Sequence, residues 1–301
     1  MNPAPKQLKE ILKTYWGYTS FLPLQEETIS SILAGRDTLT MLATGGGKSL
    51  CFQLPSLVKN GLAVVISPLI SLMKDQVDSL QDMAIPAECL NSSLPSEEQK
   101  SIINKVRKGE VKLLYLSPER LRTEGMIRLL KSVPLSFFVI DEAHCISHWG
   151  HDFREEYRNL GMIKETFVPV AVHAFTATAT AEVRRDILEQ LRLQNPESHI
   201  GPVDRPNLTY RVQPRTQVVG QVADLLKKHA AEPGIIYCLR RDDVDTLSER
   251  LIDLGFKNLP YHAGLADEIR RSHQDQFTSE KVDIMVATIA FGMGIDRSNV
   301  R

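Results

Sequence analysis

Short runs of consecutive apolar residues recur along the first two thirds of the chain, separated by longer stretches of mixed polarity. The runs occupy residues 37–43, 62–67, 111–117, 136–141 and 170–176. Short runs without polar–apolar alternation are typical of strands buried on both faces of a parallel sheet. Because the stretches between them are long enough for helices, the pattern predicts a doubly wound α/β domain.

A second group of apolar runs follows a break in this pattern. The break lies near residues 201–207, and the later runs occupy 234–238, 257–261 and 282–288. We therefore expect two α/β domains, the first over residues 1–205 and the second over 206–301. Residues 298–301 read as the start of a further strand, so we expect the second domain to be incomplete.

Composition narrows the class of protein. The chain has 301 residues, 36 Lys and Arg against 37 Asp and Glu, and four cysteines without a CxxC pair. Any nucleic-acid binding must therefore come from local grooves, and neither a disulfide framework nor a zinc site is indicated. The chain lacks a signal peptide or a run long enough to cross a membrane, so we expect a cytoplasmic protein with reduced thiols, associated with the nucleoid if bacterial.

A glycine-rich segment between a predicted strand and a predicted helix is the first candidate for chemistry; its residues are Thr44, Gly45, Gly46, Gly47, Lys48 and Ser49. Glycines let a loop fold around phosphate oxygens with its N–H groups pointing inward, and the helix that follows adds its positive N-terminus. Lys48 would reach the β- and γ-phosphates of a nucleotide, and Ser49 would bind Mg²⁺. The general pattern has a glycine where this chain has Leu42, so the match is to a variant; the alternative is a chance Lys-Ser after a turn.

Two acids end the predicted strand at 136–141. Asp141 is placed to hold Mg²⁺, and Glu142 to orient or deprotonate an attacking water. Taken alone, such a pair is more often a solvent-facing strand end. Its occurrence together with the glycine-rich loop favours a site that cleaves a phosphate bond.

Two Ser-Pro pairs, at Ser67 and at Ser117, each end an apolar run. Serine at the N-cap with proline at the first helical position predicts a helix start. Helix starts at the carboxyl edge of a parallel sheet can bind phosphates, although capping alone is the alternative. A third strand end carries Thr176, Thr178 and Thr180, which either couple the nucleotide site to the second domain or cap a helix.

An aromatic and basic segment at residues 147–154 directly follows the two acids. Trp149 and Phe153 could stack on the bases of a single strand, and Arg154 could contact a phosphate or a charge near Glu142. The alternative is a structural loop with its aromatic side chains in the core. The spacing of the nearby histidines fits no closed set of metal ligands.

These motifs together resemble the RecQ family of superfamily-2 DNA helicases. The resemblance is strongest at residues 44–49, 67–77, 141–154, 261–265 and 287–296. It implies two RecA-like domains of the P-loop NTPase fold, ATP and Mg²⁺ as cofactors, and ATP-driven 3′→5′ translocation on DNA with unwinding in repair and recombination. It also implies single-stranded DNA and duplex junctions as partners of a monomer. The aromatic segment at 147–154, which follows the Asp-Glu-Ala-His (DEAH) sequence at 141–144, argues against an RNA helicase.

The resemblance also implies roles for single residues. Gln25 would read adenine and Tyr18 would stack on it, while Leu22 stands where the family often has arginine. His144 would join the catalytic acids in coupling DNA contact to ATP hydrolysis. Residues in motifs that face DNA or nucleotide are Ser67, Lys74, Ser117, Arg120, Trp149, Phe153, Arg154, Tyr237, Arg240, Thr288 and, on the nucleotide side, Asp296.

Family members continue beyond the sequence at 299–301 into a Gln-x-x-Gly-Arg-x-Gly-Arg segment, whose arginines reach the γ-phosphate. This chain ends before that segment. Loss of such an arginine costs on the order of 10³–10⁵ in rate. The alternative expectation is therefore a catalytically weak protein that binds ATP and single-stranded DNA.

Overall fold

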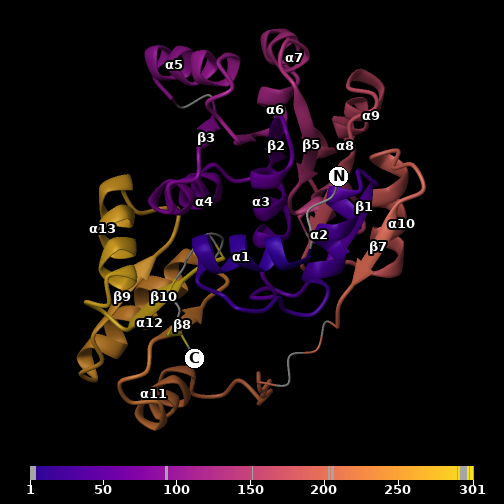
Figure 1. Ribbon diagram of the computed structural model, residues 1–301. Helices are drawn as coiled ribbons and strands as arrows, with labels where there is room; N and C mark the ends of the chain where they lie inside the picture. Colours follow the sequence, from indigo (N-terminus) through magenta and orange to yellow (C-terminus); the bar gives the residue numbers. More distant parts are fainter. Residues whose placement is uncertain are drawn as a thin grey trace. The chain divides into compact units, whose positions relative to one another are not determined.

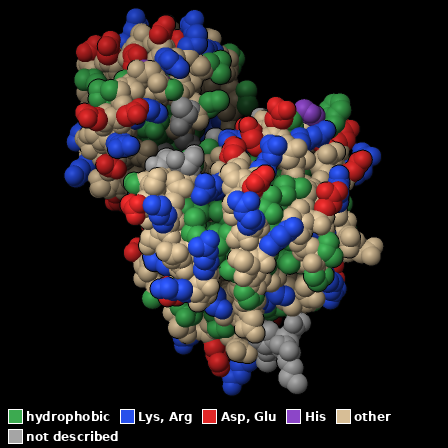
Figure 2. Space-filling view, turned by 90° about the horizontal axis from the view of Figure 1, so that it is seen from above, with side chains coloured by type: hydrophobic (Ala, Val, Ile, Leu, Met, Phe, Trp, Pro, Cys, Tyr) green, Lys and Arg blue, Asp and Glu red, His purple; other side chains and the backbone are tan. Residues whose placement is uncertain are grey.

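The computed structural model describes residues 5–91, 94–150, 152–202, 204, 207–289, 291, 297 and 299–300. The chain divides into two compact units, Met1–Asn207 and Leu208–Arg301 (Figure 1). No helix in the described ranges is long and apolar enough to cross a membrane. On the face seen in Figure 2, Lys and Arg side chains are interspersed with Asp and Glu, as the balanced composition predicts.

The first unit is built on a seven-stranded sheet with the order β3-β4-β2-β5-β6-β1-β7, and each of its pairings is parallel. The strands are β1 (Thr38–Met41), β2 (Leu62–Ile66), β3 (Ala87–Leu90), β4 (Leu113–Leu116), β5 (Leu135–Ile140), β6 (Val172–Thr176) and β7 (Glu197–Ile200). The five predicted strands are confirmed. The two edge strands, β3 and β7, were not predicted, because both are short and mix polar with apolar residues.

Helices cover both faces of this sheet. They are α1 (Pro5–Trp16), α2 (Gln25–Leu33), α3 (Lys48–Val58), α4 (Ile70–Asp82), α5 (Ser96–Arg107), α6 (Pro118–Leu121), α7 (Glu124–Lys131), α8 (Glu155–Arg158), α9 (Met162–Thr166) and α10 (Ala181–Gln190), with 3₁₀ turns η1 (Ala143–Ile146) and η2 (Asn159–Gly161). Successive residues of β2 show why its sequence is apolar throughout. Val64 packs into the core with α5, α7 and α10, whereas Val65 packs into the core with α3 and α4.

The second unit has a smaller parallel sheet with the order β8-β10-β9. Its described elements are α11 (Val218–Lys228), β8 (Gly234–Tyr237), α12 (Arg241–Asp253), β9 (Asn258–Tyr261), α13 (Asp267–Thr278) and β10 (Ile284–Ala287). Val286 packs into a core with α11 and α12, and its neighbours Met285 and Ala287 pack into a core that contains Phe277 of α13. The three predicted strands are confirmed.

One predicted helix start is wrong. The Ser117 hydroxyl accepts a bond from the Arg120 N–H at 3.4 Å and caps α6, as expected. Ser67 caps no helix, because α4 begins only at Ile70, after an extended Leu69. The Ser67 N–H instead continues the sheet by donating to the Leu116 carbonyl at 3.1 Å.

Candidate nucleotide and nucleic-acid sites

The glycine-rich loop joins β1 to α3, and Lys48 and Ser49 are the first two residues of that helix. Gly46 folds back so that its N–H donates to the Ala43 carbonyl at 2.8 Å, and a Cβ on Gly46 would lie only 2.9 Å from that oxygen. Gly47 precedes the helix with a φ of 70°. The loop is therefore a tight turn that only glycines fit, opening onto the positive end of an eleven-residue helix.

Gln25 is the buried first residue of α2 and lies against this loop. Its Oε1 accepts a bond from the Leu22 N–H at 2.8 Å, and its Nε2 donates to the Gly46 and Gly47 carbonyls at 3.2 and 3.3 Å. Tyr18 is 61% exposed and Leu22 is half exposed. The structure thus brings the candidate adenine-reading residue to the phosphate loop, with its amide engaged by the protein.

The predicted acids lie at the carboxyl end of β5. The Asp141 N–H donates to the Ile66 carbonyl at 2.9 Å, and its side chain is buried. Burial raises the pKa of the Asp141 carboxyl to about 7; the Glu142 charge adds to this, and the Lys48 charge opposes it. The Lys48 charge therefore acts on Asp141, and a desolvated carboxylate of this kind suits a bound cation.

No cluster of three or more His, Cys, Asp or Glu side chains that could hold a metal ion occurs in the part of the chain that the structure describes. Nucleotide-bound Mg²⁺ is generally held by one or two carboxylates together with substrate phosphates and water, so it needs no cage made by the protein alone.

His144 links the acids to the end of β6. Its Nδ1 lies 3.3 Å from Glu142 Oε2 and 3.0 Å from the Thr176 hydroxyl. Thr176 Oγ1 also lies 3.3 Å from the Thr178 N–H, and Thr180 caps α10 by accepting from Val183 N–H at 3.3 Å. Of the two alternatives for this threonine segment, the helix cap is present at Thr180, and Thr176 contacts His144 beside the acids; coupling to the second domain stays a prediction.

The aromatic segment is divided between solvent and protein. Trp149 is 75% exposed, so burial in the core is wrong for this residue. Phe153 packs on the His148 ring with centroids 3.7 Å apart. The Arg154 guanidinium donates to the Pro68 carbonyl at 2.9 Å and pairs with Asp152 Oδ2 at 3.1 Å. His151, in the same segment, lies outside the described residues.

The other candidate DNA-facing residues of the first unit lie on separate elements. Lys74 is exposed on α4, and the Arg120 guanidinium donates to Gln99 Oε1 at 3.0 Å. The buried Ser67 hydroxyl has no hydrogen-bond partner among the described residues. A residue that the sequence did not single out is Tyr157, whose buried hydroxyl donates to the Asp141 carbonyl at 3.0 Å; only its place beside the aromatic segment hinted at it.

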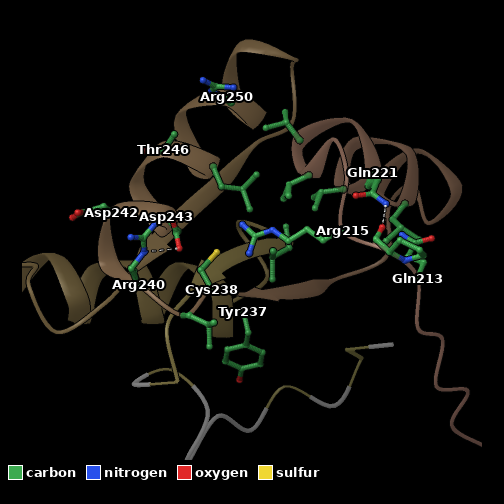
Figure 3. Close-up of a pocket in the computed structure, with 18 residues that line it drawn as sticks. Gln213, Arg215, Gln221, Tyr237, Cys238, Arg240, Asp242, Asp243, Thr246 and Arg250 are labelled. Carbon is green, nitrogen blue, oxygen red and sulfur yellow. Dashed lines mark hydrogen bonds and ion pairs between the residues drawn. The ribbon is translucent and has the colours of Figure 1, made fainter.

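In the second unit, Tyr237 and Arg240 line a pocket of about 700 Å³ between α11, α12 and β8 (Figure 3). Tyr237 is half exposed, and Arg240 pairs with Asp243 at 3.1 Å. Arg215 points into the same pocket from the segment before α11. Thr288 follows β10, where its N–H donates to the Tyr261 carbonyl at 3.1 Å. Asp296 lies outside the described residues.

Comparison with family models decides where the chain belongs. The model for DEAD/DEAH box helicases matches residues 22–187, and the model for the helicase conserved C-terminal domain matches residues 217–301. The chain belongs to the DEAD/DEAH box helicase family. The two matched ranges fall in the two structural units in turn.

Curated helicases of the RecQ type match nearly the whole chain. The ATP-dependent DNA helicase RecQ of Haemophilus influenzae is 47% identical over 291 residues, which are 97% of this chain and 47% of the relative. RecQ of Bacillus subtilis is 41% identical over 295 residues, covering 97% of this chain and 50% of the relative. The predicted RecQ resemblance is confirmed, and the chain spans about half the length of these relatives.

Solved helicase structures share the fold. The helicase Lhr of Mycobacterium smegmatis, solved with ssDNA and AMP-PNP, has a TM-score of 0.72 at 18% identity, covering 97% of this chain and 42% of that one. S. cerevisiae Dbp5, solved with RNA and ADP BeF3, has a TM-score of 0.73 at 16% identity, covering 99% and 77%. The predicted fold of two RecA-like α/β domains with parallel sheets is confirmed.

Proposed function

We propose that this helicase chain is the ATP-driven motor of a RecQ-type DNA helicase, which translocates 3′→5′ and unwinds DNA in repair and recombination. The observation that carries the proposal is the joining of three motifs in one unit. Lys48 interacts with Asp141, and His144 contacts both Glu142 and Thr176. A phosphate-binding loop, a pair of acids and a third strand end are thereby linked through side chains.

In the proposed nucleotide site, the loop 44–47 cradles the phosphates of ATP with its backbone, and Lys48 neutralises their charge. Ser49 and Asp141 are the residues that would hold Mg²⁺, which supplies charge neutralisation on the transferred phosphate when bound. Glu142 orients or deprotonates the attacking water, and His144 Nδ1, which lies 3.3 Å from Glu142 Oε2, helps to hold the carboxylate in position. Gln25 and Tyr18 contact the adenine in this proposal; Asp296, to which the family resemblance gives a nucleotide-side role, lies outside the described residues.

Single-stranded DNA is the proposed track. Trp149 offers a stacking surface that tolerates any base, because most of its side chain is exposed. Lys74, Ser117 and Arg120 of the first domain contact the sugar-phosphate backbone in this proposal, whereas the Ser67 side chain is buried. Phe153 and Arg154 position the aromatic segment. In the second domain, Tyr237, Arg240 and Thr288 are the residues proposed to contact DNA.

The finer expectations belong to the same proposal. The domains run over residues 1–205 and 206–301, the protein works as a monomer on single strands and duplex junctions, and it acts in the cytoplasm, at the nucleoid if bacterial. Each contact proposed above is made by residues of one domain, so none of them requires a second copy of the chain.

The test is ligand-dependent stability and turnover of the 301-residue chain with its Lys48→Ala variant. At 100 times its Kd, Mg·ATP should stabilise the unsubstituted protein by about 2.7 kcal/mol. The variant should lose this effect, while its melting temperature without ligand stays equal to that of the unsubstituted protein. Equal stabilisation of both proteins would show that Lys48 does not take part in nucleotide binding. Phosphate release stimulated by oligo(dT) but not by oligo(U) would support a DNA motor, and the reverse preference would indicate an RNA helicase.

A further inference from the structure

A chain of three polar side chains crosses the apolar layer between the sheet and helices α3 and α4 of the first unit. Tyr115 of β4 is fully buried, and Gln53 of α3 is 6% exposed. Gln53 Nε2 donates to the Tyr115 hydroxyl oxygen at 3.2 Å, and that hydroxyl donates to Gln76 Oε1 on α4 at 3.0 Å. Three separate elements are thus joined by two directional bonds.

The surroundings of these three side chains are apolar. Phe52, Val65, Met73 and Val77 pack in the same cluster as Tyr115. Burial raises the pKa of Tyr115 well above its ordinary value, so the hydroxyl stays protonated and keeps donating. An apolar residue would fill this layer without having to satisfy buried donors and acceptors. A satisfied polar chain, by contrast, specifies one relative position of the two helices.

One end of this hydrogen-bonded series, Gln53, leads to the phosphate loop. Gln53 lies five residues after Lys48 on α3, the helix whose N-terminus carries Lys48 and Ser49. Five residues of a continuous helix span about 7.5 Å, so a displacement of Gln53 is carried directly to the loop.

The other end leads to the aromatic segment. Gln76 lies on α4, which begins at Ile70 directly after Pro68 and the extended Leu69. The Pro68 carbonyl accepts the 2.9 Å bond from Arg154, and Arg154 belongs to the segment that exposes Trp149. A change in the aromatic segment can therefore pull on α4 through Arg154.

We propose that Gln53, Tyr115 and Gln76 are positioning residues that transmit the state of the aromatic segment to the phosphate loop, through α4 and α3. The inference rests on the proposed function, in which the aromatic segment binds single-stranded DNA and the phosphate loop binds ATP. This route is separate from the one through His144 and Thr176. It acts by setting the position of α3 relative to α4 and contacts neither ligand.

The test measures coupling between the two ligands. The Kd of a non-hydrolysable ATP analogue is determined with and without saturating oligo(dT), for the full chain and for Tyr115→Phe, Gln53→Met and Gln76→Met. Coupling between sites is typically 5–150-fold. We expect each substitution to lower the coupling ratio at least about threefold while the Kd without DNA changes little. The double variant Gln53→Met/Gln76→Met should lose no more coupling than either single variant, because both act through one hydroxyl.

A matched control separates this role from stability. Thr38 Oγ1 and His173 Nδ1 form another fully buried side-chain bond of 3.1 Å in the same unit, at the end of β1 remote from the loop. Thr38→Val should lower the melting temperature as Tyr115→Phe does, yet leave the coupling ratio unchanged. A coupling ratio that Tyr115→Phe leaves intact, or that Thr38→Val lowers equally, overturns the inference while the proposed function stands. Failure of the unsubstituted chain to bind the analogue or oligo(dT) overturns both.

Discussion

Replacement of Gly47 by alanine tests how the phosphate loop is held. Gly47 has a φ of 70°, and a Cβ there would lie 2.2 Å from Gln25 Nε2. Gly45, two residues earlier, has a φ of 83°, and a Cβ there would meet no atom within 4 Å. Both substitutions impose left-handed strain of about 1–2 kcal/mol, but only Gly47→Ala also displaces the Gln25 amide.

The additional cost follows from the bonds that Gln25 would lose. Its amide makes three bonds, of 2.8, 3.2 and 3.3 Å, to Leu22, Gly46 and Gly47. At about 0.5–1.5 kcal/mol net for each bond, their loss adds about 3 kcal/mol. We therefore expect Gly45→Ala to lower the free energy of unfolding by about 1–2 kcal/mol and Gly47→Ala by about 4–5 kcal/mol.

The measurement is urea unfolding followed by tryptophan fluorescence. Both tryptophans, Trp16 and Trp149, belong to the first unit, so the signal reports that unit alone. In a Gln25→Ala background the obstacle is gone, and Gly47→Ala should then cost no more than Gly45→Ala. Equal costs for the two glycines in the unsubstituted protein, or an excess cost at Gly47 that persists without Gln25, would refute the proposed contact.

Three further outcomes follow from the site. Burial, with the Glu142 charge, raises the pKa of Asp141 to about 7. As pH rises, Asp141 therefore ionises in the unfolded chain before it ionises in the native protein, so the free energy of unfolding falls between about pH 4 and 7. Asp141→Asn should therefore be more stable than the unsubstituted protein by on the order of 4 kcal/mol near pH 8 without Mg²⁺ and about equal near pH 4; a difference that does not vary with pH would contradict this. Trp149→Ala should change the free energy of unfolding by less than about 0.5 kcal/mol, since the side chain is exposed, yet abolish stimulation by oligo(dT); parallel loss of ATP affinity would indicate a structural role. Arg154→Lys should keep the charge but lose the fork that spans Pro68 and Asp152, reducing stimulation and not basal ATP affinity; full stimulation in this variant would exclude that contact.

In the first unit, the strands that the sequence predicted are those largely buried on both faces. Residues 62–66 are all apolar because both faces of β2 carry helices. The edge strands β3 and β7 read Ala-Glu-Cys-Leu and Glu-Ser-His-Ile. They form because a neighbouring strand offers its free hydrogen-bonding edge, and that neighbour is distant in sequence.

Two identical Ser-Pro dipeptides show how tertiary contacts override a local signal. At Ser117 the local rule holds and the hydroxyl caps α6. At Ser67 the chain stays extended through Leu69, and the Pro68 carbonyl receives Arg154 from 86 residues away. The capping rule considers only neighbours in sequence, so it could not detect that competing bond.

The sequence by itself determined the two α/β units, the phosphate loop, the acids after β5 and the family, because each depends on residue types at short and regular spacing. Only the tertiary structure decided how these parts are connected: Gln25 against the loop, His144 between Glu142 and Thr176, Arg154 on Pro68, and Tyr115 between α3 and α4. The contacts of His144 with Thr176, of Arg154 with Pro68 and of Tyr115 with the two helices join residues brought together by the order of strands in the sheet. That order is set by the packing of the whole unit, and no local stretch of sequence encodes it.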